Sequence, residues 1–219
     1  MSAAEEPKTA APPPPQPSAL LLKVAERLGP LVADHQSFRG DDCIHVEREN
    51  ILKAARALRD SPDLDFDLLL DVTCVDYFGQ PDGFHNAPET WDRNHNLVRK
   101  RAPWRHRVNL PARGDAPRFA MVYHLVSTRL LHRLRVKCRV PEDDPTIASL
   151  TGLWAGANWL ERETFDLYGI RFDGHPDLRR IYLYDEFAGH PLRKDYAKQD
   201  EQPLEPYAGP GAKEPRRPD

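Results

Sequence analysis

Alternating apolar and polar side chains predict a pair of strands within residues 119–140. The alternation runs from Phe119 to Val126, and after a short turn the chain returns from Leu134 to Val140 with every second residue apolar. A period of two is typical of a strand that buries one face. The pattern therefore predicts an antiparallel hairpin whose apolar side faces the core.

The remaining periodic stretches predict two further strands and four helices. The strands are expected near residues 43–46 and over residues 66–77, and in the second one the period places Leu68, Leu70, Val72 and Cys74 on a single face. The expected helices are residues 20–28 with Ser18 as N-cap, residues 48–59, a helix that begins at Asp144-Pro145, and residues 157–168. In the helix that begins at Asp144, Ile147, Leu150 and Trp154 would share one side.

The second strand of the hairpin carries a row of cations on its polar face, formed by Arg133, Arg135, Lys137 and Arg139. Like charges side by side on one face repel each other. Two interpretations stay open. The row guards an edge strand against aggregation, or it contacts acidic groups on a partner or on a nearby helix.

These elements predict an α+β fold with a mixed β-sheet packed by helices, in a single domain with proline-rich tails. We expect a proline-rich arm at residues 1–17, the α+β domain at residues 18–170, and a partner-binding segment with its tail at residues 171–219. A long insertion at residues 79–117 interrupts the domain, and its seven Arg or Lys outnumber its four acids. The insertion is either a solvated loop or an arm that grips an acidic neighbour.

Composition argues against several classes of protein. The net charge of −3 gives the whole molecule no electrostatic reason to coat nucleic acid or an anionic membrane. Cys43, Cys74 and Cys138 form no Cys-x-x-Cys motif, so a disulfide framework or an iron–sulfur cluster held by this chain alone is not expected. No targeting sequence and no apolar stretch of membrane-spanning length is visible. We expect the chain in a reducing compartment, bound to a membrane only through partners.

A His-Pro phrase occurs twice near the C-terminus, at His175-Pro176 and at His190-Pro191, each time followed by paired cations. Proline fixes its own φ and disfavours helix at the residue before it, so both phrases predict rigid corners. Arginines and acids alternate densely around them. A lone surface ion pair contributes only about 0–1 kcal/mol, whereas charges at an interface supply specificity. The phrases are therefore interpreted as corners that hold cations in register for docking.

Catalytic chemistry finds weaker support in these residues. Glu161, Glu163 and Asp166 precede the two histidines, but there is no His-x-x-x-His and no Glu-x-x-His on one helical turn. Nucleophile elbows and glycine-rich phosphate loops are absent from the sequence. A metal-dependent hydrolase that uses these carboxylates and histidines stays a weak alternative, as does a nucleic-acid-binding module that uses the cationic strand.

The stretch ERETFDLYGIRFDGHPDLRRI at residues 161–181, followed by GHPLRKDY at residues 189–196, resembles the signature of the 30 kDa (C-type) subunit of NADH:quinone oxidoreductase. This is a peripheral-arm component of respiratory complex I. The resemblance is specific over residues 157–196, and the order of elements from about residue 18 is similar to that family's α+β domain. The insertion at residues 79–117 departs from the family, which commonly has a short turn there.

The resemblance implies a scaffold subunit without catalytic residues, metal or cofactor of its own. FMN and iron–sulfur clusters would lie in partner subunits, carrying electrons from NADH to quinone with coupled proton translocation. The implied partners are the quinone-site (49 kDa, D-type) subunit and the B-type subunit, which has the terminal iron–sulfur cluster, on the cytoplasmic side of a bacterial inner membrane. A related ferredoxin-fed or hydrogenase-linked complex is the alternative. The expected interface residues are Glu161, Arg162, Glu163, Asp166, His175, Pro176, Asp177, Arg179, Arg180, His190, Pro191, Arg193, Lys194, Asp195 and Tyr196.

Overall fold

A five-stranded mixed sheet organises the described part of the chain, which is residues 17–78, 90–91, 97–98, 117–185 and 187–196 of a computed structural model. Its strands are β1 (Val32–Phe38), β2 (Asp41–Val46), β3 (Leu68–Asp76), β6 (Phe119–Ser127) and β7 (His132–Val140). They lie in the order β1-β2-β7-β6-β3; β2 and β7 are parallel, and all other neighbours are antiparallel. The predicted α+β class with a mixed sheet is confirmed.

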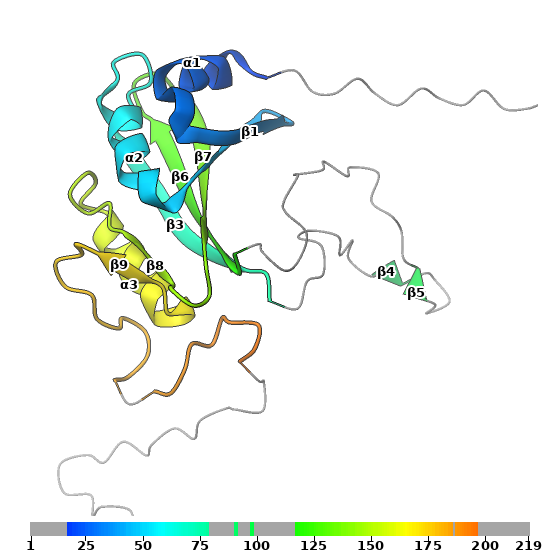
Figure 1. The fold of residues 1–219 in the computed structure, drawn as a ribbon, viewed down its shortest axis with the longest axis vertical. Helices are drawn as coiled ribbons and strands as arrows, with labels where there is room; N and C mark the ends of the chain where they lie inside the picture. Colours follow the sequence, from blue (N-terminus) through cyan, green and yellow to red (C-terminus); the bar gives the residue numbers. More distant parts are fainter. Residues whose placement is uncertain (1–16, 79–89, 92–96, 99–116, 186, 197–219) are drawn as a thin grey trace, which may run out of the picture.

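Three α-helices of the described residues pack against one face of this sheet and share a single apolar core. They are α1 (Ala19–Leu28), α2 (Ile51–Asp60) and α3 (Ala157–Tyr168), and the short 3-10 turns Gly29–Leu31 and Arg48–Asn50 adjoin the first two. Figure 1 shows α1 and α2 beside each other and α3 at the other end of the sheet, beside β8 and β9. The predicted N-cap is confirmed, because the Ser18 hydroxyl accepts the Leu21 N–H at 3.0 Å.

The predicted hairpin is confirmed as β6 and β7, but the edge-strand interpretation of its cations is wrong. β7 lies between β2 and β6, in the interior of the sheet. Its cations find contacts on the same face: the Arg135 guanidinium lies 3.8 Å from the Asp41 carboxylate, and the Arg139 guanidinium lies 4.4 Å from the centre of the Tyr77 ring. An acid on the neighbouring strand β2 and an aromatic ring just after β3 therefore oppose the repulsion within the row.

The predicted face of β3 is wrong at its first residues. Leu68 and Leu70 are 41% and 56% exposed, whereas Leu69 is buried. A bulge shifts the pairing with β6 between Leu69 and Asp71, so the period of two restarts there. Only from Val72 onward does the strand follow the predicted alternation.

The helix predicted to begin at Asp144-Pro145 is also wrong. Residues Thr146–Ala148 form a short strand, β8, that pairs in parallel with β9 (Arg171–Asp173). Ile147, Leu150 and Trp154 are nevertheless buried, because Ile147 faces the core from within β8 and the turns after β8 direct Leu150 and Trp154 into it. Apolar spacing was correct here, but it did not decide between helix and strand.

Strand β1 was not predicted, since its sequence is mostly polar and it forms one edge of the sheet. The turn into β2 places both Arg39 and Gly40 at positive φ, 54° and 86°, which is the geometry of a tight hairpin. Within the insertion only β4 (Thr90–Trp91) and β5 (Leu97–Val98) are described, as a two-stranded pair. The predicted N-terminal arm, the rest of the insertion and the tail after residue 196 lie outside the described residues.

Candidate partner-binding segment

After β9 the described chain forms no further helix or strand, and it folds back against the end of α3 (Figure 1). We call residues 174–196 the C-terminal segment. Its Leu192 N–H donates to the Leu167 carbonyl at 3.1 Å, and the Arg193 guanidinium donates through Nε to the Tyr168 carbonyl at 2.6 Å. The last turn of a helix lacks donors for its carbonyls, so the C-terminal segment completes α3.

Gly169 permits this close approach. It ends α3 in the left-handed conformation, with φ at 73°, and a Cβ at this position would lie 2.5 Å from Nε2 of His190 and 2.6 Å from Nη2 of Arg193. The His190 ring is 2.9 Å from the Asp166 carbonyl through Nδ1, and burial lowers the pKa of this histidine. The second His-Pro phrase thus packs onto the end of the helix.

The Asp166 carboxylate organises the first half of the C-terminal segment. It is fully buried, and its Oδ2 accepts three successive backbone N–H groups, those of Ile181, Tyr182 and Leu183, at 2.8–3.0 Å. The Arg180 guanidinium donates to Oδ1 at 3.0 Å. Although burial works to raise the pKa of Asp166, these donors hold it below its usual value. A charged aspartate inside the protein therefore fixes the backbone of three consecutive residues.

Arg162 fixes the backbone immediately upstream. This buried guanidinium donates to the carbonyls of Arg179 and Arg180 at 3.2 and 3.3 Å. The same group lies 4.9 Å from the ring centre of Trp159, which is 60% exposed. Arg162 thus connects an exposed aromatic ring on α3 to the C-terminal segment.

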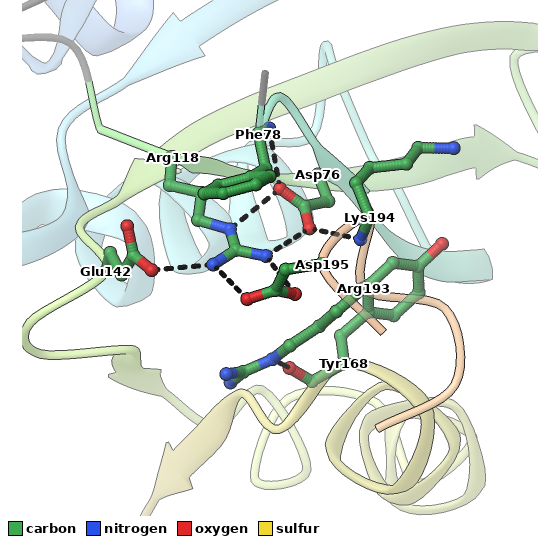
Figure 2. A network of polar contacts seen from close by, with 8 residues as sticks. All are labelled: Asp76, Phe78, Arg118, Glu142, Tyr168, Arg193, Lys194 and Asp195. Carbon is green, nitrogen blue, oxygen red and sulfur yellow. Dashed lines mark hydrogen bonds and ion pairs between the residues drawn. The ribbon is translucent and has the colours of Figure 1, made fainter. Parts of the chain in front are cut away.

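A second ionic cluster, centred on Arg118, holds the end of the C-terminal segment (Figure 2). The Arg118 side chain is 5% exposed and contacts three carboxylates: Asp76 at 2.7 Å, Asp195 at 2.6 Å and Glu142 at 2.6 Å. Because Asp76 ends β3 and Arg118 precedes β6, the cluster joins the C-terminal segment to the edge of the sheet. The predicted interface residue Asp195 thus has an ionic partner within its own chain.

Further contacts bury the Asp76 carboxylate and satisfy its oxygen atoms. Its side chain is fully buried and accepts the backbone N–H groups of Lys194 and Phe78, each at 2.8 Å, while the Phe78 ring centre lies 4.5 Å from the Arg118 guanidinium. Burial works to raise the pKa of Asp76, but hydrogen bonds from Arg118 and the two amides hold it below its usual value. The pKa of Asp195 is also lowered, chiefly by its hydrogen bond to Arg118.

Glu161 belongs to a different environment, inside the domain. It is fully buried, its Oε2 accepts the Ser149 hydroxyl at 2.6 Å, and its Oε1 accepts the Leu150 N–H at 2.7 Å. Burial raises the pKa of Glu161 to about 7, although both hydrogen bonds work to lower it. This carboxylate shapes the turn after β8.

The predicted interface residues separate into three groups by exposure. Glu161, Arg162 and Asp166 are buried, whereas Glu163, His175, Arg180, His190, Pro191, Arg193 and Tyr196 are partly buried. Pro176, Asp177, Arg179, Lys194 and Asp195 are exposed. The first His-Pro phrase forms a corner of its own, because Nδ1 of His175 accepts the Asp177 N–H at 3.0 Å and Nε2 lies 3.2 Å from the Asn158 carbonyl.

Sequence reasoning missed two features of this region. The Asp76–Arg118 pair joins residues 42 positions apart, so no local pattern reveals it, although both residues flank the insertion. Exposed aromatic side chains, Trp159 at 60% and Tyr182 at 66%, were also overlooked. The sequence feature that could have revealed them is a Trp or Tyr placed among charged residues, which is common at protein interfaces.

The carboxylates considered for metal chemistry point to different places. Glu161 faces the turn after β8 and Asp166 faces the C-terminal segment. Over the ranges that the structure describes, no group of three or more His, Cys, Asp or Glu side chains is arranged to hold a metal ion. The same residues contain no helix with the length and apolarity needed to cross a membrane.

Comparisons with known proteins agree on one family. Residues 44–202 match the family described as the 30 Kd subunit of the respiratory-chain NADH dehydrogenase. The chain is 38% identical over 189 residues to the C-type subunit of NADH-quinone oxidoreductase from Citrifermentans bemidjiense, a match that covers 86% of this chain and 94% of that protein. It is 41% identical over 179 residues to the protein of the same name from Legionella pneumophila strain Paris, covering 81% of this chain and 76% of that one.

Among solved structures, a chain of an archaeal respiratory membrane complex, the membrane-bound sulfane sulfur reductase, shares the fold. Its TM-score is 0.57 at 18% identity, and the match covers 89% of this chain and 96% of that one. The family match begins within β2 and includes α2, β3, β6, β7, α3 and the whole C-terminal segment. The chain belongs to the family of 30 kDa subunits of the respiratory-chain NADH dehydrogenase.

Proposed function

We propose that this chain is a scaffold subunit of the peripheral arm of an NADH:quinone oxidoreductase and takes no part in bond making. In this proposal the flavin and the iron–sulfur clusters belong to partner subunits, and the complex couples electron transfer from NADH to quinone with proton translocation. The chain binds the quinone-site subunit and the subunit with the terminal iron–sulfur cluster, on the cytoplasmic side of a bacterial inner membrane. The names of the relatives, which are subunits of NADH-quinone oxidoreductases, support this assignment.

The cysteines support a role outside redox chemistry. Cys74 and Cys138 each pair with Met121 from opposite sides, so a strand separates them, and burial raises the pKa of both thiols to about 12. Cys43 is also buried, and burial raises its pKa. Thiols that stay protonated are poor nucleophiles and poor metal ligands.

One observation carries the docking part of the proposal: the exposed rings of Trp159 and Tyr182 lie on or beside backbone that buried charged side chains hold in place. Asp166 holds the backbone around Tyr182, and Arg162 holds the backbone before it while contacting Trp159. Binding costs less when the contacting groups are ordered beforehand, and Trp, Tyr and Arg dominate the binding energy of many interfaces. We therefore assign Trp159, Tyr182 and the exposed Asp177 and Arg179 to the docking surface, with the buried charges as its support.

The test replaces both aromatic residues, Trp159→Ala and Tyr182→Ala, in the organism's own complex. We expect the amount of assembled complex to fall at least tenfold, while the complexes that do form keep normal NADH:quinone turnover and normal flavin and iron–sulfur spectra. Leu22→Ala is the control, because Leu22 is 58% exposed on α1 and lies outside the proposed surface. Normal assembly with reduced turnover per complex would contradict the scaffold role, and turnover with reduced ferredoxin in place of NADH would contradict the assigned electron donor.

A further inference from the structure

The arginines of the C-terminal segment are engaged within the chain itself. Arg180 contacts the Asp166 carboxylate and Arg179 contacts the Asp177 carboxylate, each at 3.0 Å. The Arg193 guanidinium donates to the end of α3. The positive charges that surround the two His-Pro phrases therefore already have contacts inside this protein.

Glu163 on α3 differs, because no cation accompanies it. Its Oε2 accepts the Tyr182 hydroxyl at 3.5 Å, a long contact with an uncharged group. Among the residues that the structure describes, none forms an ion pair with Glu163. The side chain is half-buried, so its charge is neither neutralised by the chain nor fully surrounded by water.

Two exposed aromatic rings flank the Glu163 carboxylate. Trp159 precedes Glu163 by four residues, about one helical turn, so the two side chains are neighbours on the surface of α3. Tyr182 reaches Glu163 from the C-terminal segment through its hydroxyl. The two rings are 60% and 66% exposed. We call Trp159, Glu163 and Tyr182 the α3 patch.

The structure beneath the α3 patch is held in place. Asp166 accepts the Tyr182 N–H at 2.8 Å, and the buried Arg162 guanidinium lies 4.9 Å from the centre of the Trp159 ring. The hydrogen bonds of Arg162 go to backbone carbonyls of the C-terminal segment, not to Glu163. Because Arg162 is buried and the Trp159 ring is exposed, this contact covers the inner side of the ring and leaves its outer side for a partner.

Docking would remove water from the Glu163 carboxylate, because the rings on both sides of it belong to the docking surface. A buried carboxylate without a partner is strongly unfavourable. An aliphatic side chain would leave Glu163 unpaired, and an acidic one would repel it. A Lys or Arg side chain would pair with the carboxylate and would also contact the faces of the rings, which attract cations.

The surrounding charge favours the same kind of partner. Asp185, three residues after Tyr182, is exposed and forms no ion pair with the described part of the chain. Lys194 is exposed as well, but it lies at the far end of the C-terminal segment, where Asp76 accepts its N–H. The charge that a partner meets at the α3 patch is therefore negative.

We propose that the α3 patch binds a Lys or Arg side chain of a neighbouring subunit, with Glu163 as its ionic partner and the rings of Trp159 and Tyr182 beside it. This inference rests on the proposed function and deepens it, because it names the chemistry of the partner at the same docking surface. The matching surface of the neighbouring subunit is basic.

Glu163→Gln and Glu163→Lys test the charge in the organism's own complex. Glu26→Gln and Glu26→Lys are the controls, because Glu26 is exposed on α1 and lies outside the docking surface. We expect assembled complex to fall about threefold for Glu163→Gln, which loses an ion pair, and at least tenfold for Glu163→Lys, which sets like charges against each other. Both Glu26 variants should assemble normally.

The melting temperature of the isolated chain separates docking from folding. Glutamine keeps the polar contact with Tyr182, so Glu163→Gln should melt within about 3 °C of the wild type. A larger loss of stability would overturn the inference, because Glu163 would then act in folding. Normal assembly of Glu163→Lys would overturn it too.

A structure of the assembled complex identifies the occupant of the α3 patch. It should show a Lys or Arg nitrogen of another subunit within about 4 Å of the Glu163 carboxylate and within about 6 Å of a ring centre. Solvent, a lipid, an apolar or acidic side chain, or a second copy of this chain at that place would overturn the inference. Failure of the proposed function looks different: the wild-type chain would then be absent from the purified oxidoreductase altogether.

Discussion

The sheet and the C-terminal segment are ordered by different means. In the sheet, backbone groups pair with one another along the β2, β7, β6 and β3 ladders. In the C-terminal segment, buried side chains of the domain bind the backbone: Asp166 holds three amides, Arg162 holds two carbonyls, and Asp76 holds the amide of Lys194. The C-terminal segment, which has no regular secondary structure, is thus ordered by single charged residues. Substituting any one of these residues should free the part of the backbone that it binds.

Two buried carboxylates on α3, five residues apart, differ in their hydrogen-bond donors and in their pKa values. Glu161 accepts one backbone amide and one hydroxyl, and its pKa is raised to about 7; Asp166 accepts three amides and a guanidinium, and its pKa is lowered. Both side chains are fully buried. The number and charge of the donors therefore decide whether a buried acid is ionised at neutral pH.

The largest effect is expected where the two regions are joined. Arg118→Met leaves the buried Asp76 carboxylate without its cation, and breaking a buried pair in this way costs about 3–5 kcal/mol. Urea unfolding measures the loss. Arg129→Met is the control. Arg129 pairs with Asp65, but its side chain is 58% exposed, so we expect this substitution to lower the free energy of unfolding by no more than about 1 kcal/mol. Equal costs for both variants would show that solvent reaches the Arg118 cluster.

A smaller, pH-dependent effect is expected inside the domain. The pKa of Glu161 rises from 4.5 to about 7 on folding, so the folded state binds more protons and its stability falls as the pH rises from about 4.5 through 7. Glu161→Gln keeps an oxygen for the Leu150 amide and loses the titration. The variant should gain stability relative to the wild type by about 3 kcal/mol between pH 4.5 and pH 8. A constant difference, measured by urea unfolding across this range, would contradict the raised pKa.

The smallest effect is expected within the C-terminal segment, where it should stay local. Asp166→Asn removes the charge that holds three amides, and an unsatisfied buried group costs about 1–3 kcal/mol. Hydrogen exchange of the Ile181, Tyr182 and Leu183 amides should accelerate about 10- to 100-fold, while the amides of β6 and β7 keep their protection. Equal acceleration in the hairpin would show that the C-terminal segment and the sheet open as one unit, and that the segment is not ordered independently of the sheet.

Sequence periodicity predicted the parts of the fold that depend on neighbours in the chain. The β6–β7 hairpin and α3, residues 157–168, follow directly from it. It failed where an added residue resets the period, at Leu70, and where a polar edge strand has no apolar face, at β1. It also failed after Asp144, because the buried Ile147 of β8 and the buried residues in the turns that follow together imitated helical spacing.

The candidate site was less predictable, for a physical reason. Charge density indicated that residues 161–196 do something beyond solvation, but it could not show which charges are buried. Asp166 and Arg162 become supports only because the chain folds back on α3, and Arg118 meets Asp195 across 77 positions. The assignment of the whole set to a partner interface stays a prediction, now divided into buried supports and exposed contacts.

The Asp76–Arg118 pair has a consequence for the length of the insertion. Together with the bond from the Tyr77 N–H to the Arg118 carbonyl at 3.0 Å, it closes the chain at both ends of residues 79–116. When the two ends of a loop are held together in this way, the entropy cost of closing the loop grows only with the logarithm of its length. Natural variation can therefore lengthen or shorten this stretch with little penalty to folding, and a tag or a reporter domain inserted there should leave the sheet intact.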